Sequence, residues 1–394
     1  MSRDRINRFL RRVPTHVIII LTMLIWIVPT LGLLITSFRP SQAINSSGWW
    51  TAFSVPPGSV TYTTYCSDCH GLDGTKVPSA NLTDPALISR YPRSLQLLAL
   101  LRQDVNGGTH MGDQPLPTPQ EAADIAKYLR DLSSGKAAGQ FTTSNYLDAL
   151  VGYRGRNTYA SDCAAGTQPP DLKCNLGDLL NPRGMGRAFL NSLFVTVPAT
   201  ILPILFAAFA GYAFAWLDFK GRFILFALLV GLQVVPLQMT LVPISRIYAQ
   251  LGLNGTFLGV WLFHTGFGLP YAIFLMRNFL GSLPSDLFEA AYIDGASHWT
   301  VFSRLALPLA MPAIASLSIF QFLWVWNDLL VALVFLGGTR PVMTYQISNM
   351  VTSLGAGWHL LTAAAFLSML LPMIVFFALQ RYFVRGMLAG AVKG

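Results

Sequence analysis

Residues 188–216 read AFLNSLFVTVPATILPILFAAFAGYAFAW and contain no Asp, Glu, Lys or Arg. A helix needs about 20 mostly apolar residues to cross a bilayer, so this stretch predicts a membrane-spanning helix. Pro198 and Pro203 lie inside it. Prolines are tolerated in bundled spans because neighbouring helices satisfy the freed backbone groups. We therefore expect an all-α membrane protein.

The rest of the chain agrees with this expectation. Of its 394 residues, 53% are hydrophobic and 11% are charged, whereas soluble domains carry roughly 25% charged residues. An ordinary soluble enzyme and a disordered chain are therefore excluded. Six stretches are apolar enough to span, namely 16–37, 188–216, 223–245, 256–276, 309–334 and 360–381. We expect the first to be retained, because it is too long for a signal peptide and is followed by no small-residue cleavage site.

The charged residues indicate which way the chain crosses the membrane. Residues 37–187 hold 13 basic and 12 acidic residues, so the net charge of +9 lies almost wholly in the apolar remainder. With the N-terminus inside, the inside flanks hold Arg3, Arg5, Arg8, Arg11, Arg12, Lys220, Arg222, Arg277, Arg304, Arg381, Arg385 and Lys393. The short outside loops hold only Arg246 and Arg340. Positive charge favours the cytoplasmic side, so we expect both termini in the cytoplasm of a bacterial inner membrane and residues 37–187 in the periplasm. The net positive charge of the chain is then explained by its membrane topology, and we expect no nucleic-acid partner.

The outside segment carries a cofactor motif. Residues 66–70 read Cys-Ser-Asp-Cys-His, which is the c-type haem attachment pattern. Two thiols at this spacing reach the two vinyl groups of one porphyrin, and the next residue, His70, becomes the proximal iron ligand. A thioredoxin-like site would need flanking strand–helix–strand elements, which the sequence does not suggest. A zinc site would need a fourth ligand, and adjacent Cys69 and His70 would strain its tetrahedron.

The sequence after this motif predicts two helices with a loop between them. Residues 94–105 form the first expected helix, which Asn-Gly-Gly ends. Thr118, Pro119 and Glu121 supply the second with an N-cap, a first-turn proline and a capping-box acid. Ile125, Leu129 and Leu132 recur on one side of that helix.

This arrangement resembles the small class I cytochrome c domains over about residues 58–134. The resemblance implies one covalent haem c, held by Cys66, Cys69 and His70, with Met111 as its distal ligand. Gly112 stands where that family usually has proline, and His110 is the alternative distal ligand.

The stretch 135–187 connects the haem motif to the next span. It is rich in Gly, Asn, Asp and Pro, so we expect a linker made mostly of loop. Cys163 and Cys174 close a loop of about ten residues, and an oxidising outside compartment favours a disulfide between them. Metal binding by this pair is the weaker alternative.

Between the fourth and fifth spans, residues 287–308 read LFEAAYIDGASHWTVFSRLALP; we call them the EAA segment. Their Glu289-Ala290-Ala291, Gly295 and Leu307-Pro308 have the spacing of the EAA loop of bacterial ABC importer permeases. Small and acidic residues suit a short helix that presses into a groove on a partner. Asp294 either adds a polar contact there or is a solvated acid of the loop. Small residues that merely let two helices of this chain pack together are the structural alternative.

Further motifs extend this resemblance over about residues 1–45 and 185–394. They are Asn191-Ser192-Leu193, Phe219-Lys220-Gly221-Arg222, Trp326-Asn327-Asp328 and the tail RYFVRGMLAGAVKG. Together they resemble the second permease of the carbohydrate-uptake, maltose-type family. The domains expected are 1–45 for the N-terminal tail and first span, 58–134 for the cytochrome c-like insert, 135–187 for the linker and 188–394 for the permease core. The insert departs from the family, whose first outside loop is normally much shorter.

The resemblance implies a transporter subunit rather than an enzyme. The chain has no phosphate-binding Gly-x-x-x-x-Gly-Lys-Ser/Thr loop, so ATP hydrolysis falls to partners. The expected partners are two ATPase subunits, a sister permease, a periplasmic solute-binding protein and, for the haem, a periplasmic redox partner. The implied solute is a sugar, polyol or oligosaccharide. The alternative function is a membrane-anchored electron-transfer cytochrome on a transporter-derived scaffold.

The fourth and fifth spans hold side chains with two interpretations each. Asp328 is an ionisable group near an apolar span, which suggests function, or a solvated or capping acid near the membrane face. Trp324 and Trp326 would stack on sugar rings or anchor the span. For His264, a hydrogen bond within the bundle is expected rather than a ligand role.

Overall fold

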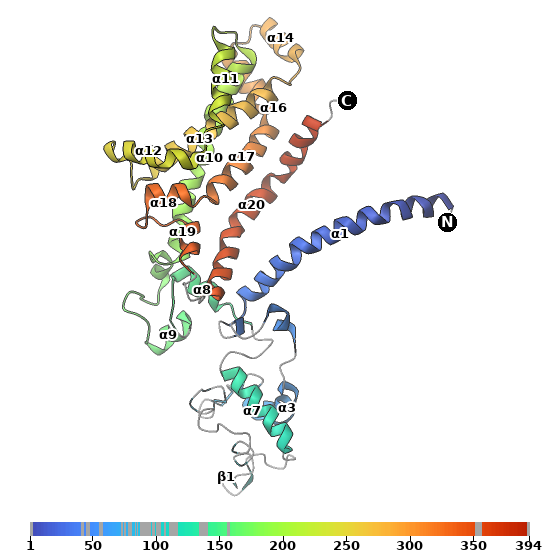
Figure 1. Cartoon of the computed structure of the whole chain (residues 1–394), viewed down its shortest axis with the longest axis vertical. Coiled ribbons are helices and arrows are strands. Elements are labelled where there is room, and N and C mark those ends of the chain that lie inside the picture. Colours follow the sequence, from blue (N-terminus) through green and yellow to red (C-terminus); the bar gives the residue numbers. More distant parts are fainter. Residues whose placement is uncertain are drawn as a thin grey trace. The chain divides into compact units, whose positions relative to one another are not determined.

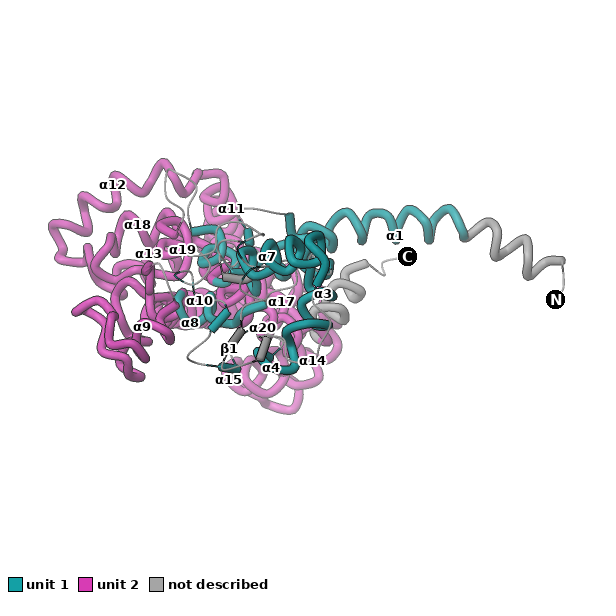
Figure 2. Tube along the Cα trace, turned by 90° about the horizontal axis from the view of Figure 1, so that it is seen from below, with its two compact units in different colours: residues 1–148, 351–363 teal, residues 149–350, 364–394 magenta. Residues whose placement is uncertain are grey.

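A computed structural model describes residues 3–40, 43–44, 48–54, 58–71, 74, 76–77, 81–82, 84, 86, 96, 99, 104–105, 108–109, 117–133, 141–155, 158–350 and 357–391. Over these residues the chain is almost entirely helical (Figure 1). It divides into two compact units, one of Met1–Asp148 with Val351–Ala363 and one of Ala149–Met350 with Ala364–Gly394 (Figure 2).

The first unit contains the N-terminal helix and the segment with the haem motif. Its described elements are α1 (Arg3–Ser37), η1 (Trp49–Phe53), α3 (Ser59–Tyr65), α4 (Ser67–His70), β1 (Asp104–Val105), β2 (Gly108–Thr109) and α7 (Pro119–Ser133), followed by the start of α8 (Ser144–Val151). β1 pairs antiparallel with β2, so that Asp104 faces Thr109 and Val105 faces Gly108. The expected end of the helix over 94–105 is therefore wrong, since its last two residues form a strand. Most of the rest of that stretch lies outside the described residues.

Helix α7 begins as its sequence predicts. The Glu121 carboxylate accepts a hydrogen bond from the Thr118 backbone N–H at 2.7 Å, and the Thr118 hydroxyl accepts one from the Glu121 N–H at 3.3 Å. These reciprocal bonds form a capping box. Ile125 and Leu129 are buried against Tyr62 of α3, which confirms the expected apolar side of the helix at those two positions.

The chain leaves α1 and returns towards α8 through one small junction. The Thr142 N–H donates to the Phe38 carbonyl at 2.6 Å, and the Asn145 side chain donates to the Ser37 carbonyl at 2.9 Å. The rings of Phe53 and Phe141 lie 5.9 Å apart. Everything between residues 54 and 140 is thus inserted between two neighbouring points of the backbone.

The second unit is a helical bundle. Its described elements are the end of α8, α9 (Tyr159–Ala165), η3 (Leu176–Leu180), α10 (Met185–Trp216), α11 (Arg222–Leu232), α12 (Leu237–Gln250), α13 (Phe257–Leu280), α14 (Ser285–Ile293), α15 (His298–Val301), η4 (Phe302–Ala306), α16 (Leu307–Leu309), α17 (Met311–Trp326), α18 (Leu330–Leu336), α19 (Met343–Ser348) and most of α20 (Trp358–Ala391). Helices α10, α13 and α17 pack on one another and form its centre.

Small residues set how closely these three helices approach. A Cβ atom at Gly211 of α10 would lie 2.7 Å from the Met276 Cβ of α13, and one at Gly268 would lie 2.8 Å from the Gln321 amide of α17. That amide donates to the Ala199 carbonyl of α10 at 3.1 Å. Close backbone approach and hydrogen bonds between helices are how spans associate where surrounding hydrocarbon removes a hydrophobic driving force.

Four helical segments among the described residues are long and apolar enough to span, namely Val13–Ser37, Met185–Trp216, Phe257–Leu280 and Trp358–Arg381. Among the described residues the total rises to six when each of two bent pairs is counted as one span. Helices α11 and α12 meet at 99°, and the helical stretch His298–Leu309 meets α17 at 68°. The third and fifth predicted spans are therefore not single straight helices. The breaks fall before Pro236 and around Ala310, and a proline cannot supply the N–H of a continuing helix.

The stretch 135–187 contains three short helices that its composition does not suggest. Helices α8, α9 and η3 lie within it, with capping boxes at Thr158 and Asn175. Each is only one to two turns long, so the apolar period that marks a helix in a sequence has no room to develop.

Candidate functional site

The EAA segment forms a short exposed helix and the turn that follows it. Helix α14 begins after Pro284 and ends at Ile293, with Asp294 as its C-cap, and Phe288 is its only buried residue. Glu289, Ala290 and Asp294 are exposed, whereas Ala291 is half-buried. The helix thus offers small and acidic side chains on its outer surface.

Gly295 ends this helix in the left-handed region, with φ of +78°. A side chain there would meet no atom within 4 Å, so the space outside the turn is open. Glycine reaches this conformation without the steric cost that other residues bear. The structure therefore brings Glu289, Ala290, Ala291, Asp294 and Gly295 together on one short element.

A large aromatic contact fixes the inner side of α14. The Phe288 ring is stacked on the Trp216 indole of α10, with centroids 3.7 Å apart. The same indole N–H donates to the Leu280 carbonyl at the end of α13, at 3.1 Å. Sequence reasoning missed both aromatic residues as members of the site. The weak signal was a Trp at the end of an otherwise uninterrupted apolar span.

The haem motif lies on two consecutive short helices. Cys66 ends α3 and precedes α4, Cys69 lies inside α4, and His70 is its last residue. The His70 N–H donates to the Cys66 carbonyl at 2.9 Å, and the Tyr62 hydroxyl donates to the Gly71 carbonyl at 2.7 Å. These bonds place the two thiols and the imidazole within little more than one helical turn.

The thiols of this motif differ in environment. Cys66 and Cys69 are both free; Cys66 is buried and Cys69 is exposed. Burial, with a smaller contribution from Cys69, raises the pKa of the Cys66 thiol to about 11. His70 is also buried. Two free thiols and a buried imidazole on one helical segment fit the donor set of a c-type haem.

The surroundings of this motif bear on its two alternatives. Over the described ranges, no group of three His, Cys, Asp or Glu side chains is placed to hold a metal ion. The elements next to Cys66 and Cys69 are helices, not the strands of a thioredoxin-like site. Met111 and His110 lie outside the described residues, so neither distal-ligand candidate is placed.

Cys163 and Cys174 form a disulfide that joins α9 to the segment before η3. A buried carboxylate organises this segment: Asp178 accepts a hydrogen bond from the Tyr159 hydroxyl at 2.6 Å and from the Lys173 N–H at 3.0 Å. The two cysteine pairs of the chain are thus in different states.

Some polar side chains of the fourth and fifth spans have hydrogen-bond partners within the chain, and others do not among the described residues. The Asp328 carboxylate accepts hydrogen bonds from the Val331 and Ala332 N–H groups and caps α18. His264 is fully buried, and its Nε2 lies 3.9 Å from the Asp328 Oδ2. That distance is too long for a hydrogen bond. Neither ring nitrogen of His264 has a hydrogen-bond partner among the described residues. The hydrogen bond expected between His264 and another helix of the bundle is therefore not seen in the described part of the chain. The Trp326 indole donates to the Ser368 carbonyl at 3.0 Å, which makes it a packing residue.

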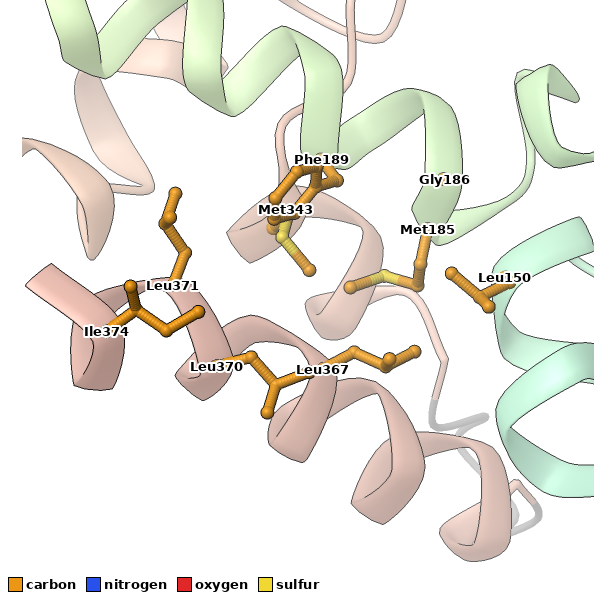
Figure 3. Close-up of a pocket in the computed structure, with 9 residues that line it drawn as sticks. All are labelled: Leu150, Met185, Gly186, Phe189, Met343, Leu367, Leu370, Leu371 and Ile374. Atoms are coloured by element: carbon orange, nitrogen blue, oxygen red, sulfur yellow. The ribbon is translucent and has the colours of Figure 1, made fainter. Parts of the chain in front are cut away.

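A pocket in the second unit is apolar throughout. Figure 3 shows its lining, with Met185 and Phe189 from α10, Met343 from α19 and Leu367 and Leu370 from α20. Its volume is about 350 Å³. No lining side chain offers a hydrogen bond or a charge, so the pocket lacks what recognition of a hydroxyl-rich solute requires.

Comparison with known proteins adds two family matches. The model of the binding-protein-dependent transport system inner membrane component family matches residues 188–389. The model of the cytochrome c family matches residues 55–133.

Individual relatives agree with the first match. The osmoprotective compounds uptake permease protein GgtD of Synechocystis sp. is 43% identical over 100% of this chain and 96% of its own length. The alpha-glucoside transport system permease protein AglG of Rhizobium meliloti is 42% identical over 96% of both chains. A probable ABC transporter permease of Pyrococcus horikoshii is 40% identical over 53% of this chain and 76% of its own.

The alignment with GgtD runs through the long segment between α1 and α10, so that segment is not confined to this chain. These relatives are permease subunits, which are transporter components rather than enzymes. The chain belongs to the family of binding-protein-dependent transport system inner membrane components.

Proposed function

We propose that the chain forms one half of the translocation path of an ATP-driven importer for a sugar, polyol or oligosaccharide. Two relatives that match it over nearly its whole length are named for uptake of osmoprotective compounds and of alpha-glucosides. Since the chain has no phosphate-binding loop of its own, two ATPase subunits hydrolyse the ATP. A sister permease completes the path, and a periplasmic solute-binding protein delivers the solute.

The observation that carries this proposal is the exposed EAA segment. Glu289, Ala290 and Asp294 lie on the outside of α14, and the space beyond Gly295 is open. Only Phe288 of this helix is buried within the chain. Ala291 packs partly against the core of this chain, but Glu289, Ala290 and Asp294 would be covered too if they served packing within it. They are the surface that docks in a groove of the ATPase.

The substitution Gly295→Asp tests this docking. It places a charged side chain into the open space, and we expect at least a tenfold loss of ATPase copurified with the chain. Gly221→Asp is the matched control, because Gly221 has φ of +83° and equally open surroundings but precedes α11. Equal ATPase recovery with both variants and with the wild type would contradict the docking role.

The domain order and topology are part of the proposal. Residues 1–45 form the cytoplasmic tail and first span, 58–134 a periplasmic haem domain, 135–187 a periplasmic connector and 188–394 the permease core. Support comes from the excess of Lys and Arg in the inside flanks and from the positions of the two family matches. A reporter cysteine in place of the exposed Thr143 should react with an impermeant reagent only from the periplasmic side.

We further propose that residues 58–134 carry one haem c. Cys66 and Cys69 would hold it through thioethers, His70 would be the proximal ligand, and Met111 the distal one. When bound, the haem supplies one-electron transfer to a periplasmic redox partner. Support comes from the match to the cytochrome c family and from the free thiols beside a buried imidazole.

A reduced-minus-oxidised spectrum of the purified chain tests the haem. The wild type should give a c-type spectrum, which Cys69→Ser should shift or abolish. Met111→Ala and His110→Ala, compared in the same way, identify the distal ligand by which of them alters the spectrum.

Transport measured with the haem reduced and then oxidised distinguishes a regulatory module from an electron carrier, since equal rates exclude regulation. Absence of ATPase from the purified wild-type complex would favour the anchored cytochrome instead.

A further inference from the structure

Helix α10 and the EAA segment are in contact but are not neighbours along the chain. Helices α13, α14 and α15 follow one another along the chain between residues 257 and 301, so a movement of α14 reaches α13 through the backbone. Helix α10 ends at Trp216, and more than 60 residues separate that end from α14. A movement of α14 therefore reaches α10 through non-covalent contacts, either by way of α13, on which α10 packs, or directly.

One side-chain connection is the Trp216 indole already described, which touches both α14 and the end of α13. A second connection is made of hydroxyl and imidazole groups. The hydroxyl oxygens of Tyr212 and Tyr292 lie 2.9 Å apart, and the Tyr292 hydroxyl lies 2.9 Å from Nδ1 of His298. Tyr212 belongs to α10, Tyr292 to α14 and His298 to α15, so this chain of hydrogen bonds joins three helices.

The chain of bonds can run in either direction. When Nδ1 of His298 carries no hydrogen, Tyr212 donates to Tyr292, which donates to Nδ1. When Nδ1 carries a hydrogen, Nδ1–H donates to Tyr292, Tyr292 donates to Tyr212, and Tyr212 donates to the His298 carbonyl, which lies 3.4 Å away. Each hydroxyl has one proton and accepts as well as donates, so both directions satisfy the same three groups.

The surroundings of this chain are aromatic and closely packed. Tyr212 is buried, and its ring meets Phe302 of η4 edge-on at 5.3 Å. Phe302 also stacks on Phe209 of α10 at 4.8 Å. Side chains of α14, α15 and η4 therefore contact α10 over two of its turns, and the hydrogen bonds fix the position of α10 relative to these three elements.

At its opposite end, α10 is bonded to another segment. The Asn191 side chain donates to the Pro341 carbonyl at 2.8 Å, and the Ser192 hydroxyl accepts from the Met343 N–H of α19 at 2.9 Å. The 32 residues of α10 correspond to about 48 Å at 1.5 Å per residue. One continuous helix thus links the EAA segment to α19 and the residues before it.

We propose that Tyr212, Tyr292 and His298 are positioning residues that make α10 follow the movements of α14. Through this connection α10 carries a displacement of the EAA segment to its opposite end, beside α19. The inference rests on the proposed docking of the EAA segment to an ATPase, and it assigns to α10 a path of transmission separate from the backbone of α13.

The test uses the whole complex with its ATPases, sister permease and solute-binding protein in proteoliposomes. Tyr292→Phe removes the hydroxyl and keeps the ring. We expect the stimulation of ATP hydrolysis by solute-loaded binding protein to fall at least fivefold, while the amount of ATPase in the complex stays within twofold of wild type. Tyr271→Phe is the matched control on α13, since the Tyr271 ring is 43% exposed, and it should leave stimulation unchanged.

A second pair of variants separates positioning from folding. His298→Asn keeps an acceptor near the place of Nδ1 and should retain at least half of the stimulation, whereas His298→Ala should lose it with no change in thermal melting. Stimulation within twofold of wild type in both Tyr292→Phe and His298→Ala would overturn the inference, as would equal loss in His298→Asn and His298→Ala. Failure of the proposed docking is a different result, namely wild-type ATPase recovery with Gly295→Asp.

Discussion

The buried carboxylate of Asp178 accepts several hydrogen bonds and so holds together the segment that the disulfide closes. Burial, the strongest influence, would raise the pKa of this carboxyl, but hydrogen bonds from the Tyr159 hydroxyl and from the backbone of Lys173, Cys174 and Asn175 together hold the pKa below its usual value. A carboxyl whose pKa is lowered by folding stabilises the fold above its unfolded pKa. That stabilisation is lost as the pH falls through the folded value.

The substitution Asp178→Ala should therefore lower stability at neutral pH. It leaves the Tyr159 hydroxyl and the Lys173 N–H without their acceptor, which costs about 3 kcal/mol. Thermal melting of the full chain in detergent measures this, and the variant should also lose part of the acid dependence of melting. Asp171→Ala is the control, because Asp171 pairs with Arg183 on the surface and exposed pairs contribute about 0.5 kcal/mol. Equal effects of the two variants would contradict the role of Asp178.

The two thiols of the haem motif should react at different rates before any haem is attached. Only the thiolate is nucleophilic, and burial raises the pKa of Cys66 to about 11. In the full chain produced without haem attachment, iodoacetamide at pH 8 should label Cys69 at least tenfold faster than Cys66. Peptide mass spectrometry measures both rates. Labelling of Cys66 should accelerate as the pH rises towards 11, and in denaturant both should react alike. Equal rates in the folded chain would show that Cys66 is not shielded.

At the scale of elements, Gly211 determines how α10 meets α13. A Cβ atom there would lie 2.7 Å from that of Met276, so Gly211→Leu should push the two helices apart and cost about 2 kcal/mol or more. Thermal melting in detergent checks this. Gly231→Leu is the control, since a Cβ atom at Gly231 in α11 would meet nothing within 4 Å. Unchanged melting of Gly211→Leu would mean that the close approach is not needed.

Local sequence patterns predicted a helix well where the sequence contained a terminating or capping signal and a long enough run of apolar residues. The capping box of Thr118 and Glu121 marked the start of α7, and the apolar stretch 188–216 marked most of α10. The bend of 99° between α11 and α12 could not be predicted, because hydropathy shows that a segment is apolar but not the direction in which the helix runs. Helices as short as α9 escaped for the opposite reason, since seven residues show too little of a period.

Contacts between distant segments limited the prediction of the candidate site. The spacing of Glu289, Ala290, Ala291 and Gly295 is local, and sequence alone identified it. The Trp216 contacts join residues more than 60 positions apart, and no pattern within one window contains such a pair. Trp326 illustrates the same limit, because its partner, the Ser368 carbonyl, lies on another helix.

At the scale of the whole molecule, the junction beside α1 predicts that the insert is removable. The bonds from Thr142 to Phe38 and from Asn145 to Ser37 lie outside the insert, and the rings of Phe53 and Phe141 already touch. Replacing residues 55–140 with a short Gly-Ser linker should leave a folded chain that still copurifies with its ATPase.

Size-exclusion chromatography and ATPase recovery measure this outcome, and the c-type spectrum should disappear. As a control, deletion of residues 38–146 also removes Asn145 and Thr142 and should prevent stable folding. Aggregation of the first deletion as well would show that the insert contributes to the fold of the permease.

The states of the four cysteines set an order of events for biogenesis. Cys163 and Cys174 are oxidised to a disulfide, whereas Cys66 and Cys69 are free, and the proposed topology places all four in one compartment. Thioether formation requires reduced thiols, but the same compartment favours oxidation. The proposed haem attachment therefore requires that Cys163 and Cys174 are oxidised while Cys66 and Cys69 stay reduced. A disulfide between Cys69 and a cysteine of the later pair would block it.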